Sequence, residues 1–356
     1  FDDKAVTVDE QESFQLDPLD EMTVGQRFER KLIDKLNRLK MVQESIPQLK
    51  EDEDAIQVAE TLHGAVSSKI EEFTNKIVSG KNSLLIRAKK DGFSLDDLGE
   101  YLYAIHAEER NKAMQEKNPK LATGSGMAKD TYIDSPEIRE IREKLNKTKS
   151  IKKKKEYLAQ IKKLEKTGTE ILGYEDILKK YRGTGIHKYA LEFKREVINK
   201  ALKIRLDNGL INKETYIELK NKFKNYVPLK GLKDGEAHTY VSGKGFNVTS
   251  SGIMRALGRE TRAENPLVQA IVDYQSAIYI SEQNKVGNAF LRMVQNNKSP
   301  MWKVSKRKFK PTYNKEGEVE FTATDLKNDE FQTYFKGQRY VIKINDKDLL
   351  RAMNNL

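Results

Sequence analysis

Apolar residues recur at intervals of three and four along most of this chain, which is the spacing of one face of an α-helix. In the first third this pattern predicts three successive helices: one from Pro18 to Pro47, one from Ile56 to Gly80, and one that begins at Ser94. Short connections favour antiparallel neighbours. We therefore expect residues 18–130 to form an N-terminal helical bundle, preceded by a loose acidic segment over 1–17.

The middle of the chain keeps the helical pattern but carries more charge. Ser135-Pro136-Glu137 combines a capping side chain, a proline in the first turn and an acid at the helix N-terminus, all of which are helix-start signals. Poor helix formers over Thr148–Ser150 predict a break, with an antiparallel pair of helices across it. With further helices as far as Pro228, residues 131–228 form a basic helical region.

The pattern changes twice beyond residue 228. Residues 229–264 contain six glycines and few periodic apolar positions, so they predict a glycine-rich loop, and loops of this length are usually functional or mobile. The loop either contacts an anionic partner through its arginines or is a linker that wraps the bundle. Asn265-Pro266 begins the longest helix, over 265–300, and alternating apolar residues from Met301 predict short strands with a hairpin turn near Gly337. Residues 301–356 thus form a small β-rich element plus a terminal helix. The expected fold class is mainly α, a multi-helix bundle with a small antiparallel β element near the C-terminus.

One helix carries an unusual concentration of hydrogen-bonding side chains. The helix that begins at Ser94 has neighbours at i+3 and i+4 spacing that can touch one another, and a glycine-containing loop follows it. The cluster comprises His106, Glu109, Arg110 and Asn111 on the helix and Gly124, Ser125 and Gly126 in the loop.

This cluster supports two interpretations. His106 and Glu109 are three residues apart, which brings an imidazole and a carboxylate within reach for acid–base catalysis. Alternatively, His106 and Arg110 bond the carbonyls of the loop and hold it in place, while Glu109 pairs with a lysine. The second interpretation is the favoured one, because no further catalytic residue accompanies the pair.

The net charge of +11 is distributed unevenly. Residues 1–20 carry seven acidic groups against one lysine, whereas residues 137–167 carry twelve Lys and Arg against five Glu. A basic block of this kind can neutralise phosphates or serve only as a solvated helix face. The candidate nucleic-acid contacts are Lys152, Lys153, Lys154, Lys155, Lys162, Lys163, Arg255, Arg259 and Arg262.

Several classes of chemistry find no support in the residues. There is no cysteine, which excludes disulfides and thiolate sites, and the four histidines are scattered, which argues against a histidine-rich metal site. Gly243-Lys244-Gly245 lacks the spacing of a phosphate loop, no dinucleotide fingerprint follows a strand, and no apolar run is long enough to span a membrane. We expect no cofactor and no metal. The residues leave enzymatic activity undecided but favour its absence.

Four short motifs, in this order along the chain, resemble those of a known protein family. Tyr101-Leu102-Tyr103-Ala104-x-His106-Ala107-x-Glu109-Arg110-Asn111, Gly124-Ser125-Gly126-Met127, Tyr226-Val227-Pro228-Leu229-x-Gly231 and Gly258-Arg259-Glu260 together resemble a helical region of the large polyvalent proteins of tailed bacteriophages and prophages. The resemblance spans residues 20–350, and it departs from the pattern at Ile105, where the family has Arg.

The resemblance implies a context and no catalytic residue. Such proteins are packaged in the virion interior and delivered to the host bacterial cell. The implied partners are other virion proteins or the rest of a larger polypeptide, and we expect this chain to be a piece of one. DNA is a further candidate partner, because of the basic block.

Three functions remain open at this point. The first is a non-catalytic structural and interaction segment of a bacteriophage internal virion protein, for cargo or genome ejection, that contacts packaged DNA. The second is an enzyme or enzyme-associated domain acting on nucleic acid or cell wall, centred on His106, Glu109, Arg110 and Asn111. The third is a host-takeover adaptor that binds a bacterial protein through the glycine-rich loop.

Overall fold

The computed structural model describes residues 36–116, 123–229, 245–253, 262–307, 312–313, 319–320 and 326–354. The fold is mainly α-helical with a small antiparallel sheet near the C-terminus, which confirms the predicted class. The acidic segment 1–17, the start of the first predicted helix, and most of the glycine-rich loop, including Arg255 and Arg259, lie outside the described residues.

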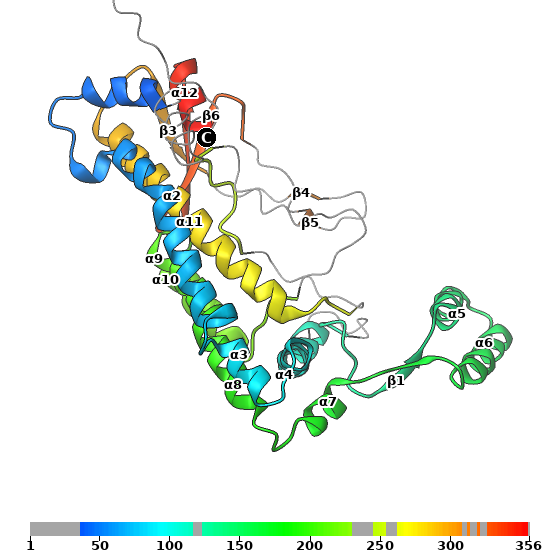
Figure 1. Ribbon diagram of the computed structural model, residues 1–356. Helices are drawn as coiled ribbons and strands as arrows, with labels where there is room; N and C mark the ends of the chain where they lie inside the picture. The colour runs from blue at the N-terminus through cyan, green and yellow to red at the C-terminus, as the bar shows by residue number, and fades with distance from the viewer. Residues whose placement is uncertain are drawn as a thin grey trace, which may run out of the picture.

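The long helix α11 (Pro266–Asn296) is the axis of the molecule (Figure 1). Its start follows from the local sequence, because the Asn265 side chain accepts a hydrogen bond from the Leu267 N–H and Pro266 occupies the first turn. Helix α2 (Ala55–Thr74) runs alongside α11, and α4, α9 and the sheet also contact it. Helix α11 therefore contributes buried residues at its start to one hydrophobic core and at its end to another.

Two large hydrophobic cores lie along α11, together with a small cluster of Leu210, Val248 and Ile280. The first gathers around α3 (Leu84–Lys90), α4 (Leu95–Gln115), α7 (Tyr174–Lys180) and α8 (Ile186–Phe193), together with the beginning of α11. The second joins the helix over 36–44, the start of α2, the end of α11, the sheet and α12 (Lys347–Asn354). Each core draws on several of the segments distinguished in the sequence.

Two helices contain a π-helical turn. Helix α2 continues into η2 (Asn75–Ser79), after the 3-10 turn η1 (Glu51–Glu53) that precedes it, and η3 (Lys194–Ile198) joins α8 to α9 (Asn199–Asp207). The two π-turns are tied together, since Lys76 Nζ lies 2.6 Å from Glu196 Oε2. Helix α10 (Lys213–Lys222) follows α9 and exposes much of its surface.

Residues 132–171 form an arm that projects from the rest of the described structure, which we call the body (Figure 1). Helices α5 (Pro136–Lys147) and α6 (Ile151–Leu164) pack on each other, with the expected break between them at Thr148, whose backbone is extended. The arm is carried by a ribbon of β1 (Tyr132–Asp134) paired antiparallel with β2 (Thr169–Ile171). These two strands were not predicted, because three residues show too little alternation to be distinguished from a loop.

The C-terminal sheet has the order β3-β7-β6, with all pairs antiparallel. Its strands are β3 (Trp302–Lys306), β6 (Glu330–Phe335) and β7 (Gln338–Ile344). The predicted hairpin turn is present between β6 and β7, where Lys336 and Gly337 both have positive φ, as a tight hairpin turn requires. A separate ribbon pairs β4 (Thr312–Tyr313) antiparallel with β5 (Val319–Glu320).

Candidate functional site

Helix α4 begins with a complete capping box. The Ser94 hydroxyl accepts from the Asp97 N–H at 3.0 Å, and the Asp97 carboxylate accepts from the Ser94 N–H at 2.9 Å. The hydrogen bond from the Ser94 hydroxyl is the first cause that lowers the pKa of Asp97, to about 2. The cap fixes where the helix starts, and so fixes which residues face the interior about three to five turns later, where His106 and Asn111 lie.

Asn111 holds the loop after α4 through three hydrogen bonds. Its Oδ1 accepts from the backbone N–H groups of Gly124 and Ser125, both at 2.8 Å, and its Nδ2 donates to the Met127 carbonyl at 2.8 Å. One side chain thus satisfies two donors and one acceptor of buried backbone, which water cannot reach. Asn111 is the residue on which the geometry of this loop depends.

Arg110 and Tyr103 add two further contacts to the same loop. The Arg110 Nε donates to the Gly124 carbonyl at 3.3 Å, and the Tyr103 hydroxyl donates to the Ser125 carbonyl at 2.7 Å. The Tyr103 hydroxyl also accepts from the Ala263 N–H at 2.8 Å, which ties the segment before α11 to the same point. Tyr103 was missed in the sequence, although it lies seven residues before Arg110 and hence on the same helix face.

The loop needs both of its glycines. A Cβ on Gly124 would lie 2.4 Å from the Cβ of Met114, so no side chain fits there. Gly126 has a φ of 83°, a conformation that residues with side chains rarely adopt. Ser125 between them is fully buried and bonds the Met127 N–H through its hydroxyl oxygen, so it closes the turn.

Within the described residues, Glu109 pairs with Asn225 and not with the expected lysine. Its two carboxylate oxygens accept from the backbone N–H and the side-chain Nδ2 of Asn225, each at 3.0 Å. This contact joins α4 to the chain that follows α10, 116 positions away. Nothing in the sequence near Glu109 indicates such a partner.

His106 bonds neither the loop nor Glu109, which corrects both interpretations of this residue. It is completely buried, and within the described part of the chain neither ring nitrogen has a hydrogen-bond partner. The rings of Phe223 and Tyr226 meet the imidazole edge-on, with centroids 5.3 and 5.6 Å away. Burial lowers the pKa of His106 to about 3, with smaller contributions from the positive charges of Arg110 and Lys194.

The arrangement is therefore a neutral imidazole in an aromatic enclosure. A general base needs a proton donor within hydrogen-bond reach and a route for the substrate. Among the described residues, no donor or acceptor lies within hydrogen-bond reach of His106, whose side chain is completely buried, and Glu109 is occupied by Asn225. Among the residues that the structure describes, no group of three or more His, Asp or Glu side chains is placed to hold a metal ion.

The lysines of α6 form a second candidate site. Lys152, Lys153, Lys154, Lys155, Lys162 and Lys163 are all exposed, and for none of them does the described structure contain an ion-pair partner. Helix α5 differs, because its lysines Lys144 and Lys147 pair with acids four residues earlier.

Four of these lysines share one side of the helix. At 3.6 residues per turn, Lys152, Lys155, Lys162 and Lys163 fall within roughly a third of the helix circumference. Ile161, the buried residue of α6, lies on the side towards α5. The four ammonium groups therefore form a strip on the solvent side of the arm, which we call the lysine strip.

Arg262 belongs to a different place. Its guanidinium lies 3.4 Å from Glu100 Oε1 and 5.9 Å from the ring centre of Tyr103, on the body rather than on the arm. Arg262 was predicted as a nucleic-acid contact together with the lysines of α6, but in the structure it lies on the body, away from them. Within the described residues, no helix is long and apolar enough to span a membrane.

Comparisons with protein-family models, with curated proteins and with solved structures find no match to this chain.

Proposed function

We propose that this chain is a non-catalytic structural and interaction segment of a bacteriophage internal virion protein, of the cargo or ejection type, and that its arm contacts packaged DNA. The observation that carries the DNA part is the lysine strip, a row of exposed ammonium groups that have no ion-pair partner among the described residues and that lie on an element projecting from the body. The phage context rests on the motif resemblance at residues 101–111, 124–127, 226–231 and 258–260. In that context the protein lies in the virion interior and enters the host bacterium with the genome.

Electrostatics supports the arm as the contact. Phosphate contacts by Lys and Arg supply most of the non-specific affinity for DNA, through release of condensed counterions. The arm places its lysines on a narrow element clear of the body (Figure 1), where a duplex can approach them without touching the cores. Lysine favours such non-specific contacts over the bidentate base recognition that arginine provides.

The body supports a structural role. The polar residues of α4 that suggested catalysis bond the chain itself: Asn111 and Arg110 bond the loop, and Glu109 bonds Asn225. None of these described contacts therefore supports the alternative that the chain is an enzyme centred on these residues. The adaptor function depends on the glycine-rich loop, most of which lies outside the described residues.

A salt titration tests the DNA contact. Binding of a labelled duplex is measured at several salt concentrations for the full chain and for a variant with Lys152, Lys155, Lys162 and Lys163 replaced by Gln. Each phosphate contact contributes about 0.9 to the slope of log affinity against log salt, so we expect the slope to become shallower by about 3 to 4 in the variant.

The control variant replaces four exposed lysines of another surface, Lys213, Lys220, Lys222 and Lys224, by Gln. It removes the same charge but leaves the arm intact, and we expect its slope to stay close to that of the parent chain. Equal losses in both variants would mean that only net charge matters, and no binding even at low salt would remove DNA from the proposal.

The phage context has a separate test. Mass spectrometry of purified particles from a phage or induced prophage that encodes this sequence should detect its peptides among the virion proteins. Their absence from particles, with detection in infected cells, would contradict the virion location and leave the DNA result unaffected.

A further inference from the structure

A groove of about 440 Å³ lies between the end of α11 and the outer strand β3 of the sheet, far from the arm and from the α4 cluster. Its volume falls within the range usual for small-molecule sites, roughly 300 to 1,000 Å³. The antiparallel register of β3 with β7 explains part of its wall, because Lys306 is opposite Tyr340 and Val304 is opposite Ile342.

The groove combines an apolar floor with a basic rim. The floor includes Val294 of α11, Trp302 and Val304 of β3, and Tyr340 of β7. Two lysines stand at its edge, and both are exposed: Lys298 just after α11 and Lys306 at the end of β3.

The charge of the groove has one sign. Among the residues that the structure describes, none of those lining the groove is acidic. In the described structure Lys298 has no ion-pair partner, and Lys306 contacts only the face of Tyr340, with its Nζ 5.5 Å from the ring centre. Two unpaired cations beside apolar and aromatic side chains are complementary to an anion that carries a planar apolar part.

We propose that this groove binds a nucleoside phosphate, either as a free nucleotide or as the phosphorylated end of a nucleic-acid strand. Lys298 and Lys306 contact the phosphate, while the base lies against the apolar floor, where stacking and burial add to the affinity. The proposal does not depend on the lysine strip, because the groove lies on the body and shares no residue with the arm.

The chain supplies its own reporter for this site. Trp302 is the single tryptophan of the sequence, and it lines the groove, so its fluorescence on excitation near the red edge of its absorption reports on the groove alone. The full chain is titrated with AMP, with adenosine, with inorganic phosphate and with a short single-stranded oligonucleotide that carries a 5′-phosphate. We expect a saturable change of Trp302 emission with AMP, a weaker response to adenosine and none to phosphate alone.

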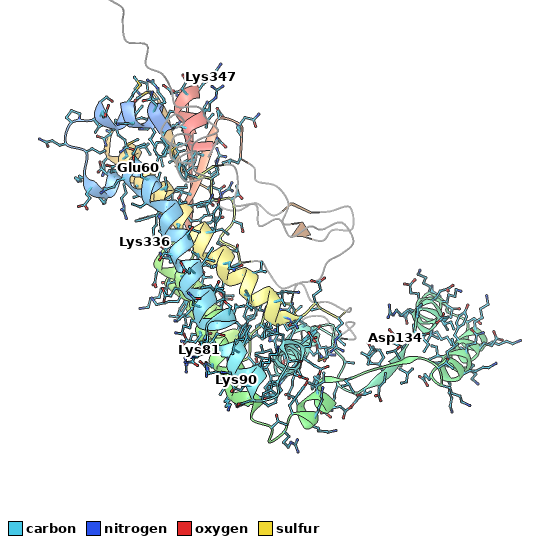
Figure 2. The ribbon with its side chains drawn as sticks, viewed as in Figure 1. Glu60, Lys81, Lys90, Asp134, Lys336 and Lys347 are labelled. Atoms are coloured by element: carbon cyan, nitrogen blue, oxygen red, sulfur yellow. The ribbon has the colours of Figure 1, made fainter. Side chains whose placement is uncertain are left out.

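A pair of matched variants links the response to the rim. Lys298→Ala combined with Lys306→Ala should weaken AMP binding by about tenfold or more, because it removes both charge-assisted contacts. Lys81→Ala combined with Lys90→Ala removes two exposed lysines at the opposite end of the body from α12, as Figure 2 shows, and should leave the titration unchanged. Thermal unfolding of both variants checks that each remains folded.

The outcomes are distinct. Saturation with AMP assigns the site to free nucleotides, and saturation with the oligonucleotide only assigns it to strand ends. The proposal is overturned if neither ligand changes Trp302 emission at millimolar concentration, if adenosine acts as strongly as AMP, or if the Lys298 and Lys306 variant binds as the parent does. Because the lysine-strip variant keeps this groove intact, loss of DNA binding there and loss of nucleotide binding here are separable results.

Discussion

Helices α4 and α6 use their polar side chains in opposite ways. Eleven of the 21 residues of α4 are buried, including His106, Arg110 and Asn111, and the polar ones among them serve the chain's own backbone or lie enclosed by aromatic rings. Helix α6 buries only Ile161 of its 14 residues, and within the described part of the chain its lysines have no ion-pair partner. A buried polar group must be satisfied within the protein or cost free energy, whereas an exposed charge remains available to another molecule.

The same difference sets the stability of the two regions. Helix α4 is held by packing against α7, α8 and α11, so its geometry is part of the cooperative fold. Helices of the length of α5 and α6 are marginal in isolation. The two helices pack on each other, and each buries one residue, Ile138 of α5 and Ile161 of α6. The ribbon of β1 and β2 holds them at its end. We therefore expect the body to tolerate changes in the arm, but not changes in the loop contacts of α4.

The largest effect is expected from Asn111→Ala. The substitution leaves the N–H groups of Gly124 and Ser125 buried without their partner, and each such group costs about 1 to 3 kcal/mol. The Met127 carbonyl loses the bond at 2.8 Å and keeps only the longer one from the Ser125 hydroxyl, at 3.4 Å. We expect a loss of about 3 kcal/mol in the free energy of unfolding, measured by urea denaturation.

Asn221→Ala is the control, since Asn221 is an exposed asparagine on α10. Its effect should stay within about 0.5 kcal/mol. Similar losses in the two variants would show that the bonds of Asn111 to the loop contribute little, and the distinction between the two helices would then fail on the side of α4.

A smaller effect is expected from the pH dependence due to His106. Its pKa is about 3 in the folded protein and 6.5 ordinarily, so between these values the unfolded chain binds more protons. The free energy of unfolding must therefore rise with pH across this window, and stability is lost as pH falls below 6.5. Between pH 7 and pH 5 the loss from this residue is about 2 kcal/mol.

His106→Phe keeps a planar ring beside Phe223 and Tyr226 but cannot titrate. Urea denaturation from pH 7 to pH 5 should show the parent losing stability relative to this variant. The carboxyls of Asp97 and Glu196 do not contribute to the change between pH 7 and pH 5. Hydrogen bonds, chiefly from Ser94 and Lys200 respectively, lower both pKa values to about 2, so these groups affect stability only at lower pH. Parallel curves for parent and variant would contradict the enclosed, neutral imidazole.

The smallest effect on stability is expected from removal of the arm. Because Asp134 and Thr169 are paired across the ribbon, residues 135–168 can be replaced by Asn-Gly, which forms a two-residue hairpin turn. The free energy of unfolding of the body should change by less than about 1 kcal/mol, since the cores share no buried residue with α5 and α6. DNA binding should disappear. A variant that fails to fold would show that the arm is part of the cooperative unit.

Local sequence was sufficient to predict most of the helices and their ends. The starts of α4, α5 and α11 depend on Ser94, Ser135 and Asn265, whose side chains bond N–H groups two or three residues later. The turn at Lys336 and Gly337 is equally local. Such signals act over a few residues, and so they can be recognised without knowledge of the fold.

Only the tertiary structure decided which residues meet. The i+3 spacing of His106 and Glu109 suggested a pair, but each has its own surroundings, because Phe223, Asn225 and Tyr226 come from a segment more than 100 positions away. No periodicity encodes such a contact, since it depends on how α4 and the chain after α10 are both positioned by other elements. The sequence by itself determined the helices, the basic block and the loop with its glycines. The packing decided that the polar residues of α4 bond other parts of the same chain, and that the lysines of α6 remain free of ion pairs in the described structure.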